Sequence, residues 1–358
     1  MMGLVFSGNL VLMYIFWELT AICSWRLIGF HRTEEKPVAN SDKALLVTVF
    51  GSACMLIGFK LIFHEFNTLS VLELRGHVLS AWPLFLVLLG MLAKSAQFPL
   101  QTWLPDAGVA PSPVTALLHA AALVKIGVYA FARLFLATFT MPQASVQLII
   151  VMAALSVFIA ACSAVIENDI KRILAYSTIS QIAYIVLGLA IGTPLAVTGA
   201  LFYILVHGLG KAGLFLGAGV VEHYAHEKDI RKLGGMKRVM PITSFGFFLN
   251  ALSVMGIPPF GGFFAKLFIV LGAIQTGNYF VAGLIVFTAI LTLVYLTRLW
   301  TKVFNGPVTH PGTPETQKLM PVVVVIFAVL SLISFLVLLW PLNLVGRAVA
   351  VTQTAVFK

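Results

Sequence analysis

The sequence predicts an all-α polytopic membrane protein, and three observations support this prediction. Hydrophobic residues make up 60% of the 358 residues and charged residues only 10%, whereas soluble globular proteins carry about 25% charged residues. Mean hydropathy is +1.00. The apolar residues also gather in runs of about 20, the length that crosses a bilayer as a helix. This composition excludes a soluble enzyme, a disordered chain and a nucleic-acid-binding protein.

Ten apolar runs follow one another along the chain, and we expect each to form a transmembrane helix. The first run is too long for the apolar core of a signal peptide and lacks a basic leader and a small-residue cleavage site, so we expect it to remain as a membrane helix. The runs are residues 8–30, 42–63, 81–104, 113–138, 145–166, 173–192, 195–220, 241–273, 279–301 and 319–342.

The basic residues between the runs predict the topology. If the runs alternate in direction, one side of the membrane receives Arg32, Lys36, Lys43, Lys171, Arg172, Lys228, Arg231, Lys232, Lys237, Arg238, Lys302 and Lys318. The other side receives Arg75, Arg133, Arg347 and Lys358. The side rich in Lys and Arg faces the cytoplasm in most membrane proteins. We therefore predict a protein of the cell (inner) membrane with both termini outside.

Proline interrupts two of the runs, the third at Pro99 and the eighth at Pro258 and Pro259. Proline inside a helix removes a backbone donor and clashes with the preceding turn. The freed carbonyls are tolerated in hydrocarbon only where protein or a water-filled cavity satisfies them. Two broken helices in corresponding positions, each near a lysine (Lys94 and Lys266), are typical of inverted-repeat transporters.

Because the breaks lie five helices apart, we expect two inverted five-helix repeats, the first truncated at its N-terminal end. Residues 1–140 would form the first, incomplete half-channel repeat and residues 141–305 the second. Residues 306–358 would form a C-terminal transmembrane helix and tail.

Ionisable residues inside the predicted helices are the candidate functional groups, since each costs about 2.5–3.5 kcal/mol at a helix centre on insertion scales. His207 and Lys211 are four residues apart and should share a helix face. His119 and Lys125 are six apart and should lie on different faces at different depths. The full set of proton-translocation candidates is Glu18, Lys94, His119, Lys125, His207, Lys211 and Lys266.

This set is interpreted as a proton path across the membrane interior. Burial favours the neutral form of a lysine, and a nearby carboxylate favours the charged form. A Glu18–Lys94 pair that opens and closes would therefore make Lys94 release and hold a proton in turn. Histidine suits the intermediate positions because its unperturbed pKa lies near neutrality.

Simpler interpretations exist for the same residues. Each lysine could extend its ammonium group to the membrane interface, which is our interpretation of Lys60, Arg133 and Arg298. Glu18 could be a hydrogen-bonded carboxyl, and His119 a satisfied core histidine. Residues 167–172 are interpreted as a solvated cytoplasmic loop. Four histidines that receive no role are predicted to lie in loops: His64, His77, His223 and His226.

No cofactor or metal site is predicted. The three cysteines, Cys23, Cys54 and Cys162, have neither metal-type nor disulfide spacing. Gly208, Gly210 and Gly213 match the dinucleotide-binding pattern by letters, but they lie in an apolar run with no preceding strand. We interpret these glycines as sites of close helix packing.

Several segments together resemble the antiporter-like proton-conducting subunits of complex I (L, M and N types), of membrane-bound hydrogenases and of Mrp antiporters. Phe16-Trp17-Glu18-Leu19-Thr20 resembles the glutamate helix of that family. Residues 94–107 resemble its broken-helix signature, and the likeness continues in order to about residue 305. The further matching segments are residues 111–119, 171–181 and 256–266, with His207 and Lys211.

The resemblance implies roles for individual residues. Glu18 and Lys94 would be the coupled pair of the first half-channel, and Lys211 the central connecting lysine. Lys266 would be the exit-side lysine of the second half-channel, with the two buried histidines as intermediate stations. His119 together with Lys125 is closer to the Mrp and hydrogenase members than to the respiratory L-type subunit.

The resemblance also indicates two differences from the family. The chain begins just before the glutamate helix, so we expect the preceding helices to come from a partner chain or a split gene, or to have been lost through a misassigned start. It ends after the tenth helix, without the long lateral helix of the largest complex I member.

We predict a proton-translocating subunit of a complex I-like redox-driven pump, of the NADH:quinone oxidoreductase or membrane-bound hydrogenase type. The chain itself would perform no redox chemistry and hold no cofactor. Its partners would be other membrane subunits, including a second antiporter-like subunit and a redox arm, together with lipid and protons. The alternatives are a subunit of an Mrp-type sodium/proton antiporter and a truncated scaffold that keeps the motifs without a complete channel.

Overall fold

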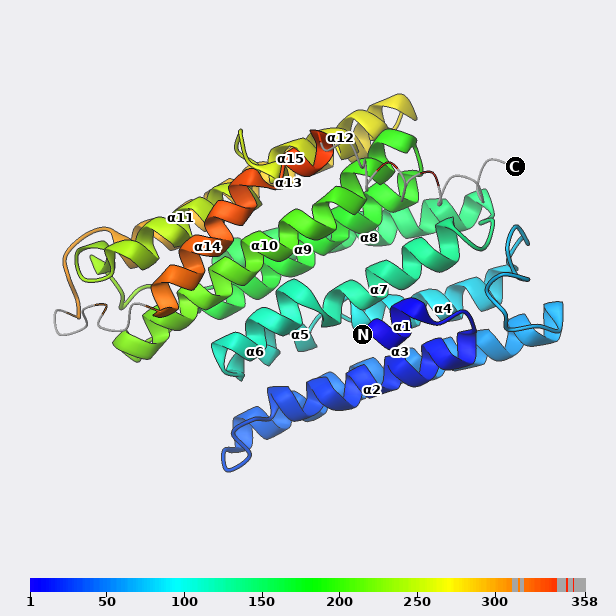
Figure 1. Ribbon diagram of the computed structural model, residues 1–358, viewed down its shortest axis with the longest axis horizontal. Helices are drawn as coiled ribbons and strands as arrows, with labels where there is room; N and C mark the ends of the chain where they lie inside the picture. The colour runs from blue at the N-terminus through cyan, green and yellow to red at the C-terminus, as the bar shows by residue number, and fades with distance from the viewer. Residues whose placement is uncertain (311–314, 316–318, 340–345, 347–349, 351–358) are drawn as a thin grey trace.

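The computed structural model is an elongated bundle whose long helices run in roughly the same direction (Figure 1). It describes residues 1–310, 315, 319–339, 346 and 350. Within these residues the secondary structure is helical apart from isolated β-bridges. The predicted all-α fold is confirmed. The end of the tenth predicted run, at residues 340–342, and the basic residues Lys318, Arg347 and Lys358 lie outside the described residues.

The helices of the described chain have the following bounds. The α-helices are α1 (Met2–Phe6), α2 (Leu10–Ile28), α3 (Glu35–Phe66), α4 (Ala81–Lys94), α5 (Trp103–Asp106), α6 (Ser112–Ala116), α7 (Leu123–Phe131), α8 (Gln143–Ile166), α9 (Ile170–Ile191), α10 (Pro194–Ala225), α11 (Pro241–Met255), α12 (Gly261–Gln275), α13 (Tyr279–Phe304), α14 (Leu319–Ile333) and α15 (Leu336–Leu339). Four short segments complete the list: the 3₁₀ turns η1 (Ala107–Val109) and η4 (Met236–Arg238), and the π-helical η2 (Leu117–Ala121) and η3 (Ala132–Leu136).

Eight helical segments of the described chain are long and apolar enough to cross a membrane. They coincide with eight of the ten predicted runs. The other two predicted runs are those with internal proline, and each is divided into two shorter helices. The ends differ most at α3, which begins at Glu35, and at α10, which continues to Ala225.

Each broken helix has partners for the carbonyls at its break. In the first, α4 ends at Lys94, and the Trp103 indole beyond the break donates to Ala93 O at 2.9 Å. In the second, α11 ends at Met255, and Lys266 Nζ donates to Val254 O at 2.8 Å. A prolyl peptide bond is cis in both breaks, at Phe98-Pro99 and Pro258-Pro259. The structure thus satisfies these carbonyls inside the protein.

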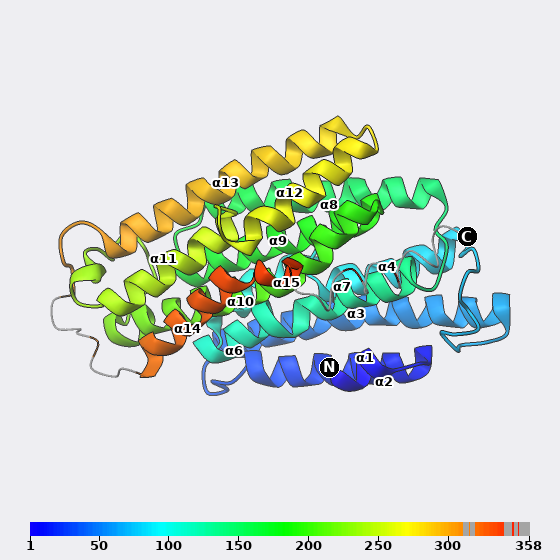
Figure 2. The ribbon, with the colours of Figure 1, turned by 45° about the horizontal axis from the view of Figure 1, so that its top comes forward.

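Helix α9 forms the centre of the bundle, since almost all of its residues are buried. Helices α8, α10 and α12 pack against it, while α3 packs against both α2 and α4 at the edge that carries the N-terminus (Figure 2). The outer faces of α2 and α13 expose large apolar side chains such as Ile15 and Ile290. Apolar outer faces around a polar interior are what a lipid-facing bundle requires.

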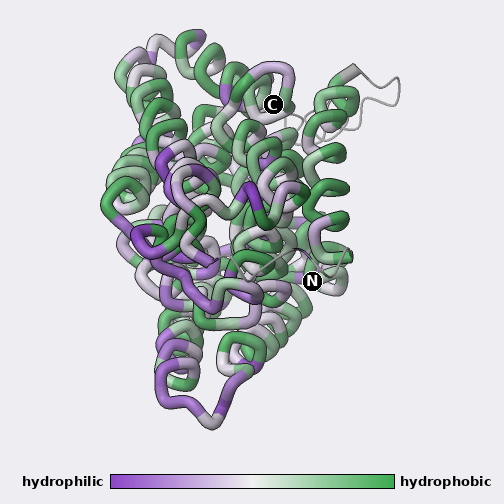
Figure 3. Tube along the Cα trace, turned by 90° about the vertical axis from the view of Figure 1, so that its left-hand side faces the viewer, coloured by the Kyte–Doolittle hydropathy of each residue, from purple (hydrophilic) through white to green (hydrophobic). Residues whose placement is uncertain are grey.

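The charged side chains gather at one end of the bundle. Every ion pair within the described residues lies there, on the ends of α3, α5, α8, α9 and α10 and in the loop that follows α10. Figure 3 faces this end and shows the hydrophilic loops that cover it. It is the end that the sequence assigns to the Lys/Arg-rich side of the membrane, and we call it the basic end.

Candidate functional site

The first predicted pair, Glu18 and Lys94, is held together through the backbone of α2. Lys94 is fully buried at the end of α4, and its Nζ donates to Trp17 O at 3.2 Å. The same ammonium lies 5.5 Å from the centre of the Trp17 indole ring. Glu18, the next residue, lies close enough for its charge to act on Lys94. Among the described residues it forms no ion pair, and its buried Oε1 has no hydrogen-bond partner.

A hydrogen bond connects this pair to the next candidate along the bundle. Ser95, which follows Lys94, donates through Oγ to Val124 O at 3.0 Å. Lys125 is buried in α7, and its Nζ crosses to α10, where it donates to Ile204 O at 2.7 Å. Gly208 of α10 leaves the space that this ammonium occupies. Lys125 therefore lies where α7 meets α10.

The prediction that His119 and Lys125 lie on different faces is wrong. His119 stacks on Phe215 of α10 with ring centroids 4.5 Å apart, and Lys125 also reaches α10. The reason is the π-helical segment η2, which contains His119 and separates it from α7. A π turn holds more residues than an α turn, so counting at 3.6 residues per turn gives the wrong face. The two side chains do lie at different depths.

Helix α10 carries the two central candidates, His207 and Lys211, and both are fully buried. Lys211 Nζ donates to Leu174 O of α9 at 3.0 Å. His207 precedes Gly208, whose space is occupied by Lys125 Nζ, and its ring lies 6.1 Å from that of Tyr203, which also faces Lys266. His207 thus lies between the candidates of α7 and α12.

Lys266 of α12 occupies an aromatic pocket at the second break. Besides its bond to Val254 O, its Nζ donates to Met255 O at 3.3 Å, so it binds the carboxyl-terminal end of α11. The negative end of a helix dipole favours a cation at this position. The rings of Tyr184 and Tyr203 lie 5.2 and 5.9 Å from the ammonium.

A buried polar network lies beside Lys266 and was not predicted. Gln181 accepts a hydrogen bond from Tyr203, and its amide group donates to Tyr295 at 3.4 Å. Tyr295 donates in turn to Ser177 Oγ at 2.8 Å. Each of these residues is uncharged, so the cost of burying a charge does not single it out in the sequence.

The two buried histidines are the least satisfied groups of the site. Neither ring nitrogen of His119 or of His207 has a hydrogen-bond partner among the described protein atoms. A buried polar group without a partner costs about 1–3 kcal/mol. Water or a transported ion supplies such a partner in a hydrated interior. These two rings and the buried lysines Lys94, Lys125, Lys211 and Lys266 are the groups that we call the polar row.

Sequence reasoning missed a buried ion pair below this row. Lys171 was assigned to a solvated loop, but it is 1% exposed in the first turn of α9. Its Nζ lies 2.6 Å from Glu222 Oε2 near the end of α10 and donates to Ala110 O at 3.0 Å. The partners are 51 residues apart in the chain, so the local pattern around Lys171 gives no sign of the pairing.

The two arginines that we predict to extend to the interface also make specific hydrogen bonds. Arg298 donates to Val165 O at 2.7 Å, to Glu167 O at 2.8 Å and to Asn168 Oδ1, and so holds the end of α8. Arg133 donates to Ser7 O at 3.2 Å. Lys60 is exposed, as its interpretation requires.

Ion pairing sets the electrostatics of the basic end. Burial raises the pKa of the Asp106 carboxyl, but hydrogen bonds and charge from Lys43 and Arg172 outweigh burial and hold this pKa below its ordinary value. Hydrogen bonds from Arg231 lower the pKa of Asp229 to about 2. Burial is also the largest influence on Asp169, whose pKa it raises. Within the described residues, no group of three His, Cys, Asp or Glu side chains is arranged to hold a metal ion.

Comparison with known proteins places the chain among membrane transport subunits. The family model described as "NADH:quinone oxidoreductase/Mrp antiporter, TM" matches residues 7–292. Na(+)/H(+) antiporter subunit A1 of Staphylococcus saprophyticus is 38% identical over 282 residues, which are 73% of this chain and 35% of that protein. NAD(P)H-quinone oxidoreductase chain 5 of Picosynechococcus sp. is 40% identical over 283 residues, 73% of this chain and 42% of that protein.

A solved structure shows the same fold. A chain in the structure of the Mrp complex from Dietzia sp. DQ12-45-1b superposes with a TM-score of 0.87 at 25% identity, covering 99% of this chain and 75% of that chain. This chain therefore spans less than half the length of the two curated relatives and three quarters of the solved one. The resemblance seen in the sequence is confirmed. This multi-pass membrane protein belongs to the NADH:quinone oxidoreductase/Mrp antiporter family of transmembrane subunits.

Proposed function

We propose that this chain translocates protons as one membrane subunit of a multisubunit complex. The observation that carries the proposal is the polar row, in which four lysines and two histidines are buried and no ring nitrogen of either histidine has a hydrogen-bond partner among the described residues. Buried groups at this cost persist in membrane proteins where they serve ion transport. A row of groups that each bind and release a proton supplies that transport.

In this proposal the row works as two connected half-channels, one in residues 1–140 and one in residues 141–305. Glu18 and Lys94 begin the first, and Lys266 ends the second. Lys125 joins the two, because it belongs to α7 and binds a carbonyl of α10. Glu18 is the acid whose approach to Lys94 or withdrawal from it would bias that lysine between its charged and neutral forms.

Two kinds of complex fit this role. The similarity to NAD(P)H-quinone oxidoreductase chain 5 supports a redox-driven pump in which a redox arm and a second antiporter-like subunit are partners. The likeness to a chain of the Mrp complex, over 99% of this chain, supports a sodium/proton antiporter. Isolation of the native complex and mass spectrometry of its subunits separate the two, since only the pump contains iron–sulfur or quinone-site subunits.

The proposed orientation places the basic end in the cytoplasm of a cell whose inner membrane holds the protein. The rule that Lys and Arg favour the cytoplasmic side supports this assignment. Labelling of single cysteines placed at the basic end and in the loop after α3, with a reagent that cannot cross membranes, tests it. Labelling of the basic end from outside intact cells would refute it.

The Lys94→Ala substitution tests the function directly. Proton uptake by inverted membrane vesicles should fall to background, because the substitution removes a buried proton carrier. Lys60→Ala is the matched control, since Lys60 is an exposed lysine on the neighbouring helix α3. The amount of assembled complex should be the same in both variants. Normal proton uptake by an assembled Lys94→Ala complex would refute the proposal.

A further inference from the structure

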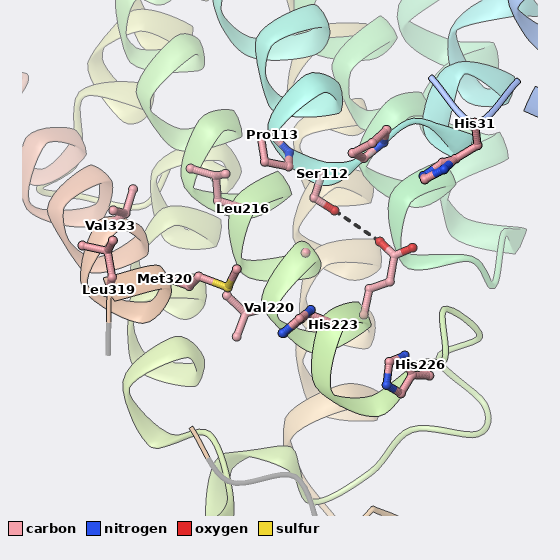
Figure 4. Close-up of a pocket in the computed structure, with 13 residues that line it drawn as sticks. His31, Ser112, Pro113, Leu216, Val220, His223, His226, Leu319, Met320 and Val323 are labelled. Carbon is pink, nitrogen blue, oxygen red and sulfur yellow. Dashed lines mark hydrogen bonds between the residues drawn. The ribbon is translucent and has the colours of Figure 1, made fainter. Parts of the chain in front are cut away.

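A cavity of about 750 Å³ opens at the basic end, beside the buried pair formed by Lys171 and Glu222. The start of α6, the end of α10 and the start of α14 form its walls. Figure 4 shows Ser112, His223 and His226 around it, with His31 from the loop after α2 on the far side. Its α14 wall is apolar, with Leu319 and Met320, so the polar groups concentrate on the α6–α10 side.

Glu222 is the group that connects this cavity to the protein interior. Its side chain is 26% exposed, whereas that of Lys171 is 2% exposed. Oε2 accepts from Ser112 Oγ at 3.2 Å (Figure 4) and pairs with Lys171 at 2.6 Å, and Oε1 pairs with Lys228 at 2.8 Å. One carboxylate therefore contacts both the cavity and a buried ammonium group.

The register of α6 and α10 places His119 of the polar row further into the bundle than the Glu222 carboxylate. The two helices run antiparallel, and Ser112 lies opposite Glu222 because Gly219 lets α6 approach closely. Seven residues further along, His119 lies opposite Phe215. Seven residues of helix span about 10 Å. His119 is thus in the next layer inward.

We propose that this cavity is the proton-uptake vestibule of the chain and that the Lys171–Glu222 pair is its gate. The inference rests on the proposed function. A proton from water in the vestibule binds the Glu222 carboxylate, and the neutral acid no longer holds the Lys171 ammonium. Lys171 then gives its own proton, through bridging water, to a ring nitrogen of His119 in the next layer and takes the proton of Glu222, which restores the pair. His119 passes its proton to the neutral form of Lys211, and one proton has moved inward.

The neighbouring charged groups assist this cycle without replacing Glu222. Lys228 holds the second carboxylate oxygen, and the charge of Asp169 also acts on Lys171. His223 and His226 line the vestibule, but within the described residues neither is hydrogen-bonded to the carboxylate. The His119 ring stacks on Phe215, which lies one turn of α10 from Lys211, so His119 is a polar group between the gate layer and Lys211.

Two variants test the proposal in the intact complex. Glu222→Gln removes the titrating oxygen but keeps the shape, and should slow proton uptake by about a hundredfold, as loss of a positioned acid–base group does. Glu222→Asp should retain most of the rate. Glu227→Gln is the matched control, since Glu227 is an acid of the following loop paired with Lys232 outside the vestibule. Equal rates in Glu222→Gln and the control would overturn the proposal.

A second test uses Ser112→Cys, which places a thiol on the vestibule wall and leaves the Glu222 carboxylate its ion pairs with Lys171 and Lys228. A bulky thiol reagent that cannot cross membranes should stop proton uptake when it reaches the basic end and leave the parent protein unaffected. Full activity of the labelled variant would refute the vestibule. The two proposals fail separately: if Lys94→Ala abolishes transport and the vestibule variants do not, only the uptake route is wrong. If Lys94→Ala is also active, the proposed function itself is wrong.

Discussion

Gly208→Ala should impair transport through a single contact. A methyl group at position 208 would lie 2.5 Å from Lys125 Nζ, and non-bonded heavy atoms pack at about 3.5–4.0 Å. The ammonium must therefore withdraw by about 1 Å or more, and it cannot keep its 2.7 Å bond to Ile204 O. A hydrogen bond to a charged group is worth about 1.5–3 kcal/mol. Proton uptake should fall by a factor of about ten to a hundred, as each 1.4 kcal/mol is tenfold.

The fold should survive this substitution, because the displaced atom is the free end of a flexible side chain. Alanine also favours a helix over glycine by about 1 kcal/mol, so α10 itself is strengthened. The assay is proton uptake by inverted vesicles, with the assembled complex measured on a native gel.

Gly283→Ala is the matched control, since Gly283 also lies within a membrane helix, α13, and a methyl group there meets no atom within 4 Å. It should transport protons at the parent rate. Full transport by an assembled Gly208→Ala complex would refute the assignment of Lys125 as the junction between α7 and α10. Loss of assembly in Gly208→Ala, with Gly283→Ala intact, would refute the claim that only the lysine moves.

Two further predictions concern the basic end. Asp106→Asn should lower the free energy of unfolding by about 1–3 kcal/mol at neutral pH, because Lys43 and Arg172 lose their shared charged acceptor. Folding lowers the pKa of Asp106, so its contribution to stability is complete above the unfolded pKa of about 3.9 and is lost as pH falls through the folded pKa. Thermal unfolding in detergent should therefore show that the difference in stability between the variant and the parent shrinks in acid. A difference that stays constant with pH would contradict the prediction. Arg298→Ala should lower the unfolding temperature by several degrees, because the carbonyls of Val165 and Glu167 lose their donor. Lys302→Ala, at an exposed site of the same helix, should leave the unfolding temperature unchanged. Equal unfolding temperatures of the two variants would contradict the role of Arg298 in holding the end of α8.

The sequence predicts the membrane helices well because the free energy of transferring a whole apolar run from water into the bilayer decides where they form. All ten runs are found as helical segments, and the proline-containing runs divide at their prolines. Hydropathy averages over about 20 residues, so it says little about one turn. The predicted helix face of Lys125 relative to His119 was therefore wrong, because a single π-helical segment precedes Lys125.

The candidate site was predictable only where a residue is unusual for its surroundings. A charge in an apolar run, such as Lys211, is visible in the sequence because of its cost. Lys171 stands among other charged residues at a helix start, so its burial was invisible. Its partner Glu222 comes from another helix, and only the packing of α6, α9 and α10 brings them together. The network of Gln181 and Tyr295 was not predicted because neutral polar residues carry no charge whose burial cost would mark them in the sequence.

Because of the π segment, the number of residues between Ser112 and Lys125 decides whether His119 and Lys125 both face α10, more than the identity of those residues does. Each residue turns a helix by about 100°, so removing one residue near Ala122 would rotate either His119 or Lys125 away from α10. The helix would still form, since its flanks are held by the Ser112–Glu222 and Ser95–Val124 bonds. A homologous chain one residue shorter here would thus keep the fold and both side chains yet lose their common face. In aligned relatives, a gap at this place would mark divergence of the transport route.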